Sequence, residues 1–325
     1  MAATLLDTFR ALSSFNPKPE DIAGARWENY VDWAIAQGLA PLAAYNLEYR
    51  LAAADVPDWA RDRLLSVYQG SLNDNVMKLV SFKRAIDELE RSRVLLLGAA
   101  SFAESLYPHI AFRPVADIQL LARAEEMGAL VEVLRQGEFH REGKVETTRG
   151  AARILSDGRT EIAIFTEPLG EAARGQLSGI FERALPMKVY GPAVFRPNHE
   201  DAVLLLALDH ARAGYQVPYI SYVDLRELLS GARSLAGPYS KSLDIDALKR
   251  RALEWNIERA LYASASIVQR LFPEIRDVAE ALKPSLRSST QKLLDRWVVA
   301  KVVELGAMRI LRGSERWRRL LTGGN

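Results

Sequence analysis

A run of four apolar residues, Val94–Leu97, interrupts a chain that has helical periodicity on both sides of it. A short continuous apolar run that ends in a glycine is typical of a strand buried on both faces. A second strand is expected at Asp117–Leu121. A hairpin is expected across residues 153–166, because the central Asp157-Gly158 pair favours a type I′ turn. With the short helical patterns between them, these elements predict a small mixed α/β unit.

The residues on either side of this unit indicate helices. Trp27, Tyr30, Val31 and Ala34 lie three or four positions apart, which places them on one helix face. Further helices are expected at 58–93, 199–213, 219–230, 244–254, 255–271 and 288–312. The predicted fold class is therefore α+β, with a small mixed β-sheet core and with helical regions that pack around it. The expected domains are an N-terminal helical region at 1–92, the α/β core at 93–197 and a C-terminal helical domain at 198–325.

The composition excludes several classes of protein. The 325 residues contain 43 lysines and arginines against 41 aspartates and glutamates, so neither a polybasic nor an acidic tail dominates the chain. The absence of cysteine excludes disulfides, thiolate zinc sites and thiol nucleophiles. There is no strong nucleic-acid signal, no apolar stretch near the roughly 18 residues of a transmembrane segment, and no basic start ahead of an apolar run. We therefore expect a cytoplasmic protein.

Residues 309–325 depart from this charge balance, because they hold five arginines and a single acidic residue, Glu315. A solvated helix end is the simpler interpretation. Since Trp317 lies among the arginines, an amphipathic contact with a membrane surface or a partner is the alternative.

Most sequence motifs that carry chemistry are absent. The chain lacks G-x-S-x-G, G-x-G-x-x-G and H-E-x-x-H. The segment from Gly137 to Lys144 is the nearest match to a phosphate-binding loop. It fails because five residues separate its two glycines and Val145 follows the lysine, where magnesium binding needs serine or threonine. The four histidines have no i, i+4 pairing, and His210, which lies among apolar residues, is predicted to be a core residue.

One ordered set of short segments is more specific. It comprises the strand and helix start LLLGAAS at 95–101, SLYP at 105–108, Arg113-Pro114, and the strand DIQLL at 117–121. This set resembles the core of the uncharacterised bacterial nucleotidyltransferase family, a member of the polymerase-β-like nucleotidyltransferase superfamily. Asn73 or Asn75 before the core, and Asp201, Asp209-His210 and Asp224 after it, are similar to further landmarks of that family. The resemblance covers roughly residues 26–230.

The resemblance implies a metal-dependent site on the strands. Residues i and i+2 of a strand point to one face about 6.5–7 Å apart, which suits two ligands of a magnesium pair. It implies catalytic roles for Asp117, Gln119 and Glu161, with Asp117 and Glu161 as ligands of Mg²⁺. It implies that a nucleoside triphosphate is bound by Gly98, Ala99, Ser101 and Arg113, and that the nucleotidyl group passes to an unknown acceptor.

The sequence departs from the family pattern where the chemistry is most sensitive. Gln119 replaces an expected aspartate, Leu97 replaces an expected lysine, and Ala163 stands where the family often has histidine. A glutamine carbonyl can ligate magnesium but brings no negative charge. The sequence therefore favours a degenerate member that has weak or no catalysis and retains a nucleotide-binding-like cleft.

Several alternatives stay open at this stage. The protein could be an active magnesium-dependent enzyme, with a shifted site that recruits Lys144, Glu125 or Glu126, or an interaction scaffold that binds a protein partner and no nucleotide. Individual residues also have structural interpretations. Glu161 and Gln119 could be solvent-facing strand residues, and Arg113 could only anchor its loop.

Overall fold

The fold was analysed in a computed structural model of the chain. It describes residues 3–14, 16–89, 93–147, 149–169, 175–230, 243–285 and 288–293. The arginine-rich segment at 309–325 and most of the helix expected at 288–312 lie outside the described residues. In the part that the structure describes, no helix combines the length and the apolar character that crossing a membrane requires.

The described strands form one mixed seven-stranded sheet with the order β3-β4-β5-β2-β1-β7-β6. β1 pairs antiparallel with β2 and parallel with β7, while β2 pairs parallel with β5. This arrangement confirms the predicted α+β class. The strands are β1 (Val94–Leu97), β2 (Ile118–Leu121), β3 (Arg141–Thr147), β4 (Gly150–Ser156), β5 (Glu161–Phe165), β6 (Leu185–Pro186) and β7 (Val194–Arg196).

The strands that the sequence predicted are those with buried apolar runs. β1 and β2 are confirmed, and β4 and β5 form the antiparallel hairpin around Asp157-Gly158, where Gly158 has a φ of 97°. β3 was missed because all seven of its residues are exposed, so it shows no alternation of apolar and polar side chains. β6 and β7 were missed because they contain two and three residues.

Helices occupy both ends of the described chain and the connections within the core. They are α1 (Leu5–Ser13), α2 (Trp27–Ala36), α3 (Ala40–Tyr45), α4 (Asp58–Ile86), α5 (Gly98–Ser105), α6 (Met127–Gln136), α7 (Leu177–Arg183), α8 (His199–Arg212), α9 (Tyr219–Ser230), α10 (Ile245–Glu254), α11 (Glu258–Leu271), α12 (Arg276–Ala281) and α13 (Ser288–Leu293). The helices predicted at 199–213, 219–230, 244–254 and 255–271 are confirmed within a few residues. The long N-terminal helix ends at Ile86 rather than near residue 93.

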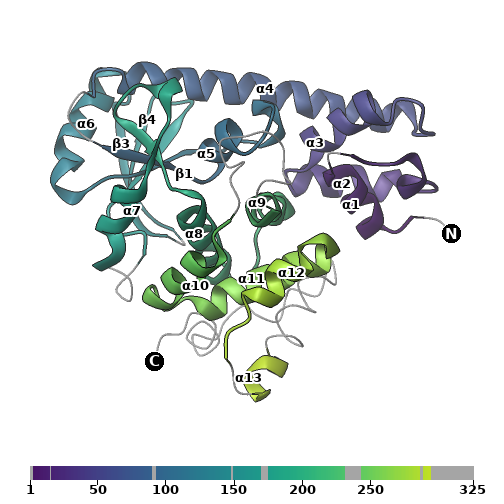
Figure 1. Cartoon of the computed structure of the whole chain (residues 1–325). Helices are drawn as coiled ribbons and strands as arrows, with labels where there is room; N and C mark the ends of the chain where they lie inside the picture. The colour runs from purple at the N-terminus through teal and green to yellow at the C-terminus, as the bar shows by residue number, and fades with distance from the viewer. Residues whose placement is uncertain are drawn as a thin grey trace.

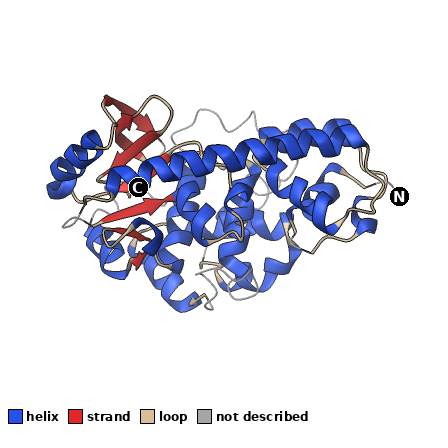
Figure 2. Cartoon of the chain, turned by 90° about the horizontal axis from the view of Figure 1, so that it is seen from above, coloured by secondary structure: helices blue, strands red, loops and turns tan. Residues whose placement is uncertain are grey.

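The sheet lies between two layers of helices (Figures 1 and 2). On one face, Leu96 and Leu120 join a buried cluster with Phe82 of α4 and Leu134 of α6. On the opposite face, Leu97 belongs to a second cluster, which continues through α8, α9 and α11 and into the N-terminal helices. The residues of β1 therefore contribute alternately to two cores, as a strand buried on both faces requires.

Helix α4 runs along the molecule from the N-terminal helices to the sheet (Figure 1). Its buried Asn75 donates from Nδ2 to the carbonyl oxygens of Ile110 and Arg113 at 2.6 and 2.9 Å, and accepts from the amide of Val115 at 2.9 Å. Lys78 donates to the carbonyl of Val115 at 2.7 Å. Together these bonds fix the loop that leads from α5 into β2, and hence the start of β2.

The two terminal helical regions pack directly against each other. Phe9 of α1 lies in edge contact with Trp33 and Tyr219, with ring centroids 5.6 and 5.4 Å apart, and packs on Phe272 at 5.3 Å. Aromatic pairs in such geometry add to the free energy gained by burying their area. The predicted domain boundaries at 92 and 197 stay predictions, although one apolar cluster joins the two outer segments.

Candidate functional site

The site begins at Gly98, where β1 passes into α5. Gly98 has a φ of 57°, a conformation that favours glycine, and a Cβ at this position would lie 3.3 Å from Oε1 of Gln119. The N-cap residue of α5, Leu97, makes no capping hydrogen bond with its side chain. The N-terminal amides of α5 therefore lie close to β2 without a side-chain acceptor at the cap.

Asp117 and Gln119 lie two positions apart at the start of β2, on the face that carries Leu97. Nε2 of Gln119 donates to both carboxylate oxygens of Asp117, at 2.9 and 3.2 Å. In the sheet, Gln119 is flanked by Leu97 of β1 and Ala163 of β5, both buried. Because both neighbours are apolar, the side-chain amide of Gln119 forms its hydrogen bonds with Asp117 and Arg149 rather than across the sheet.

Arg149, from the turn between β3 and β4, lies at the centre of this polar group. Its Nη1 donates to Oε1 of Gln119 at 2.6 Å, and its Nε donates to Oδ1 and Oδ2 of Asp209 at 2.9 and 2.8 Å. Nη2 also pairs with Asp209, which comes from α8. The Arg149 side chain is 9% exposed. We call Asp117, Gln119, Arg149 and Asp209 the tetrad.

The tetrad carries a net charge of −1, because two aspartates face one guanidinium and one neutral amide. Burial alone would lower the pKa of Arg149, but the carboxylates of Asp209 and Asp117 outweigh burial and raise this pKa above its ordinary value. Arg149 therefore keeps a full positive charge although its side chain is buried.

The structure brings together some of the residues that the sequence singled out. Gly98, Asp117 and Gln119 meet at the tetrad, and Ala99 lies in the first turn of α5 beside Gly98. Ser101 is 1% exposed, and its Oγ has no hydrogen-bond partner among the described residues.

Other predicted residues form no hydrogen bond or ion pair with the tetrad among the described residues. Glu161 is exposed at the first position of β5, and the Ile118–Ile162 pairing of β2 with β5 places it beside Asp117, although no hydrogen bond or ion pair joins it to the tetrad. Lys144 is exposed on β3, and Glu126 accepts from Arg123 at 3.4 Å. The roles proposed for these side chains in a shifted site stay predictions.

Arg113 is held by Asp224 of α9. Its Nε donates to Oδ1 and Oδ2 of Asp224 at 3.1 and 2.8 Å, while Tyr107 donates its hydroxyl to Oδ1 at 2.7 Å. Asp224 is fully buried, and burial raises the pKa of its carboxyl against the opposing effect of Arg113. Arg113 thus anchors its loop to the C-terminal region, which agrees with the structural interpretation of this residue.

The hydrogen bonds of the tetrad leave little room for a divalent cation. Both oxygens of Asp117 already accept from Gln119, and both oxygens of Asp209 accept from Arg149. The guanidinium of Arg149 also donates to the carbonyl oxygen of Gln119, and its positive charge repels any cation placed beside it. Within the described residues, no group of three or more histidines, aspartates or glutamates could hold a metal ion. These residues, as arranged, do not fit magnesium.

Comparison with known families identifies the family of the chain. Residues 23–273 match the model of the family described as uncharacterised nucleotidyltransferase, which spans more than half of the chain. The chain belongs to this family. No curated protein and no solved structure matches it. The matched residues include all four members of the tetrad.

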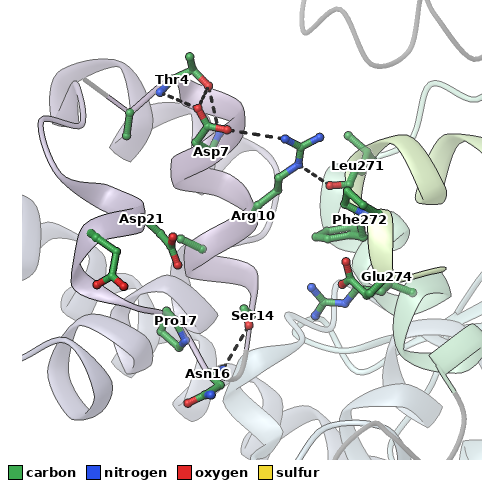
Figure 3. A pocket seen from close by; sticks show the side chains of 15 residues that line it. Thr4, Asp7, Arg10, Ser14, Asn16, Pro17, Asp21, Leu271, Phe272 and Glu274 are labelled. Atoms are coloured by element: carbon green, nitrogen blue, oxygen red, sulfur yellow. Dashed lines mark hydrogen bonds and ion pairs between the residues drawn. The ribbon is translucent and has the colours of Figure 1, made fainter. Parts of the chain in front are cut away.

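Two cavities of the protein differ in position and size. A small cavity of about 10 Å³ lies between the N-terminus of α5 and α8, and Gly98, Ser101 and Arg149 line it. A larger one, of about 600 Å³, lies between α1 and the end of α11. Figure 3 shows Arg10 reaching across this larger cavity, where its Nε donates to the carbonyl of Leu271 at 2.6 Å. That cavity lies where the two terminal helical regions meet, so we assign it to their packing.

The sequence reasoning missed Arg149 and left Asp209 without a role. The Arg149-Gly150 pair, with a φ of 100° at Gly150, marks the turn between β3 and β4. This turn was not predicted because the residues of β3 show no strand pattern in the sequence. Asp209 was noticed as a family landmark, but its partner lies 60 positions earlier in the chain.

Proposed function

We propose that this protein is a degenerate nucleotidyltransferase, which binds a nucleoside triphosphate but does not transfer its nucleotidyl group at an enzymatic rate. The observation that carries the proposal is the position of Arg149. Its guanidinium bonds to Gln119, the residue at the position where the resemblance expects a metal-ligating aspartate. The proposal includes the cytoplasmic location expected from the sequence.

A guanidinium supplies charge but not the other functions of a metal pair. Two-metal transfer orients the attacking and leaving oxygens and neutralises the charge that develops between them. Arg149 carries a single positive charge and is already bound to Asp209. The loss of a metal contact of ~3–5 kcal/mol in the transition state slows turnover by roughly 10²–10⁴. This loss supports binding without efficient transfer.

Thermal unfolding with ATP, GTP, CTP or UTP, each in EDTA and in Mg²⁺, tests the proposal. A hundredfold excess of one nucleotide over its Kd should stabilise the protein by about 2.7 kcal/mol, which raises Tm by a few degrees, and EDTA should leave this shift in place. Labelled nucleotide should show no transfer in Mg²⁺. Rapid transfer that depends on Asp117 would restore the active-enzyme alternative.

The scaffold alternative has one observation in its favour. Val76, Met77 and Val80 form an exposed apolar stripe on α4, with 40, 48 and 41% of their surfaces accessible. If no nucleotide at millimolar concentration raises Tm, this alternative replaces the proposal.

A further inference from the structure

The small cavity at the N-terminus of α5 contains an unsatisfied donor. Ser101 lines the cavity, is 1% exposed, and has no partner for its Oγ among the described residues. Buried hydroxyls are nearly always hydrogen-bonded, so an unpaired one points to a missing partner. The cavity volume of about 10 Å³ leaves room for about one water molecule.

Two further groups at the same cavity favour an anion. The N-terminus of α5 lies there, and this end of a helix carries a partial positive charge that attracts negative groups. Arg149 also lines the cavity, with its guanidinium 3.6 Å from the place of a Cβ on Gly98. A buried hydroxyl, a helix start and a guanidinium therefore face one volume from two separate elements.

In the structure, the carboxylate of Asp209 satisfies this guanidinium. The pair is bidentate, the geometry that a phosphate would also adopt on arginine. Asp209 is 17% exposed, so its carboxylate has access to solvent if it leaves Arg149. It would not then be isolated, because Arg212 also interacts electrostatically with Asp209.

We propose that the carboxylate of Asp209 competes with a phosphate of the ligand for the guanidinium of Arg149. A phosphate that enters beside Ser101 takes the guanidinium from Asp209 and needs no metal ion. The inference rests on the proposed function, since it names the cation that the nucleotide's phosphates meet and the residue that opposes their binding. It goes beyond that proposal because it predicts that the affinity for the ligand's phosphate depends on the Arg149–Asp209 pair.

Exchange of Asp209 for a phosphate at Arg149 requires part of the site to move, because the cavity is small. A phosphate does not fit in about 10 Å³, so the side chain of Asp209 or the turn that carries Arg149 must move. The turn follows β3, an edge strand whose residues are all exposed. The exposed side chains of β3 therefore add little packing that would oppose a shift of this turn.

Calorimetric titration of the full chain with inorganic tripolyphosphate in EDTA tests the inference. Asp209→Asn removes the competing charge, so it should bind about tenfold more tightly than the wild type. Arg149→Gln should weaken binding by about tenfold or more, and Ser101→Ala by roughly fivefold. Arg149→Lys keeps the charge but loses the bidentate geometry, and it provides a second variant if Arg149→Gln does not fold.

Arg153→Gln is the matched control. Arg153 lies on the neighbouring strand β4 and pairs with Glu142 at 2.7 Å, outside the tetrad, so its replacement should leave tripolyphosphate affinity unchanged. Equal affinities in the wild type, Asp209→Asn and both Arg149 variants would overturn the inference, as would weaker binding by Asp209→Asn.

The same titrations, carried out with ATP as well as tripolyphosphate, distinguish failure of this inference from failure of the proposed function. If ATP binds but all Arg149 and Asp209 variants bind it like the wild type, the nucleotide proposal stands and the inference fails. If tripolyphosphate binds with the expected dependence on Arg149 and no nucleotide binds, the inference stands and the proposed function fails.

Discussion

Replacing Asp224 with alanine is expected to lower the free energy of unfolding by about 3–5 kcal/mol, because it removes one partner of a buried ion pair. The substitution leaves the guanidinium of Arg113 and the hydroxyl of Tyr107 without their acceptor. Urea unfolding at neutral pH measures the change. The loss should be large enough to threaten folding in a protein of ordinary stability.

Two further variants make this prediction specific. The double variant Arg113→Met, Asp224→Leu should be more stable than Asp224→Ala, since no unpaired charge stays buried. Asp74→Ala removes an exposed ion pair with Arg159, at 3.6 Å, and should change stability by less than about 1 kcal/mol. An equally small effect for Asp224→Ala would contradict the assigned role of the Arg113–Asp224 pair.

The second large effect concerns pH. His210 is fully buried, its Nε2 lies 2.8 Å from Oγ of Ser221, and burial lowers its pKa from 6.5 to about 4. Between these two values the unfolded chain binds a proton that the folded protein does not, so stability falls as pH decreases from 6.5 toward 4. From pH 7.5 to pH 5, His210 should account for a loss of about 2 kcal/mol.

Comparison of the wild type with His210→Gln isolates this contribution. The variant should lose about 2 kcal/mol less between pH 7.5 and 5 in urea unfolding, whatever its stability at pH 7.5. His140→Gln, at an exposed position, should follow the wild type. Identical pH dependence in the wild type and His210→Gln would exclude the neutral buried state of this histidine.

The parts of the fold that the sequence predicted are those in which a local pattern and tertiary packing agree. The run Val94–Leu97 is a strand buried on both faces, and the Asp157-Gly158 turn joins β4 to β5. β3 could not be predicted because an exposed edge strand needs no apolar alternation; its register with β4 holds it in the sheet instead.

The candidate site was predicted only in part, for a different physical reason. Gly98, Asp117 and Gln119 come from adjacent strand ends, so a family pattern in the sequence identifies them together. Arg149 and Asp209 meet only after the β3–β4 hairpin joins the sheet and α8 packs beside it. No local pattern encodes that contact. Magnesium binding through Asp117 and Glu161 stays a prediction, which the arrangement of the tetrad does not favour.

The central claim is that Arg149, rather than a divalent metal, supplies the positive charge of the tetrad. Paramagnetic resonance of Mn²⁺ tests it most directly, with Asp117→Asn as the reference, because surface carboxylates contribute equally to both proteins. The account predicts that the wild type and Asp117→Asn bind the same amount of Mn²⁺, with and without nucleotide. One additional Mn²⁺ per chain in the wild type, absent from Asp117→Asn, would contradict the account and restore a metal-dependent site.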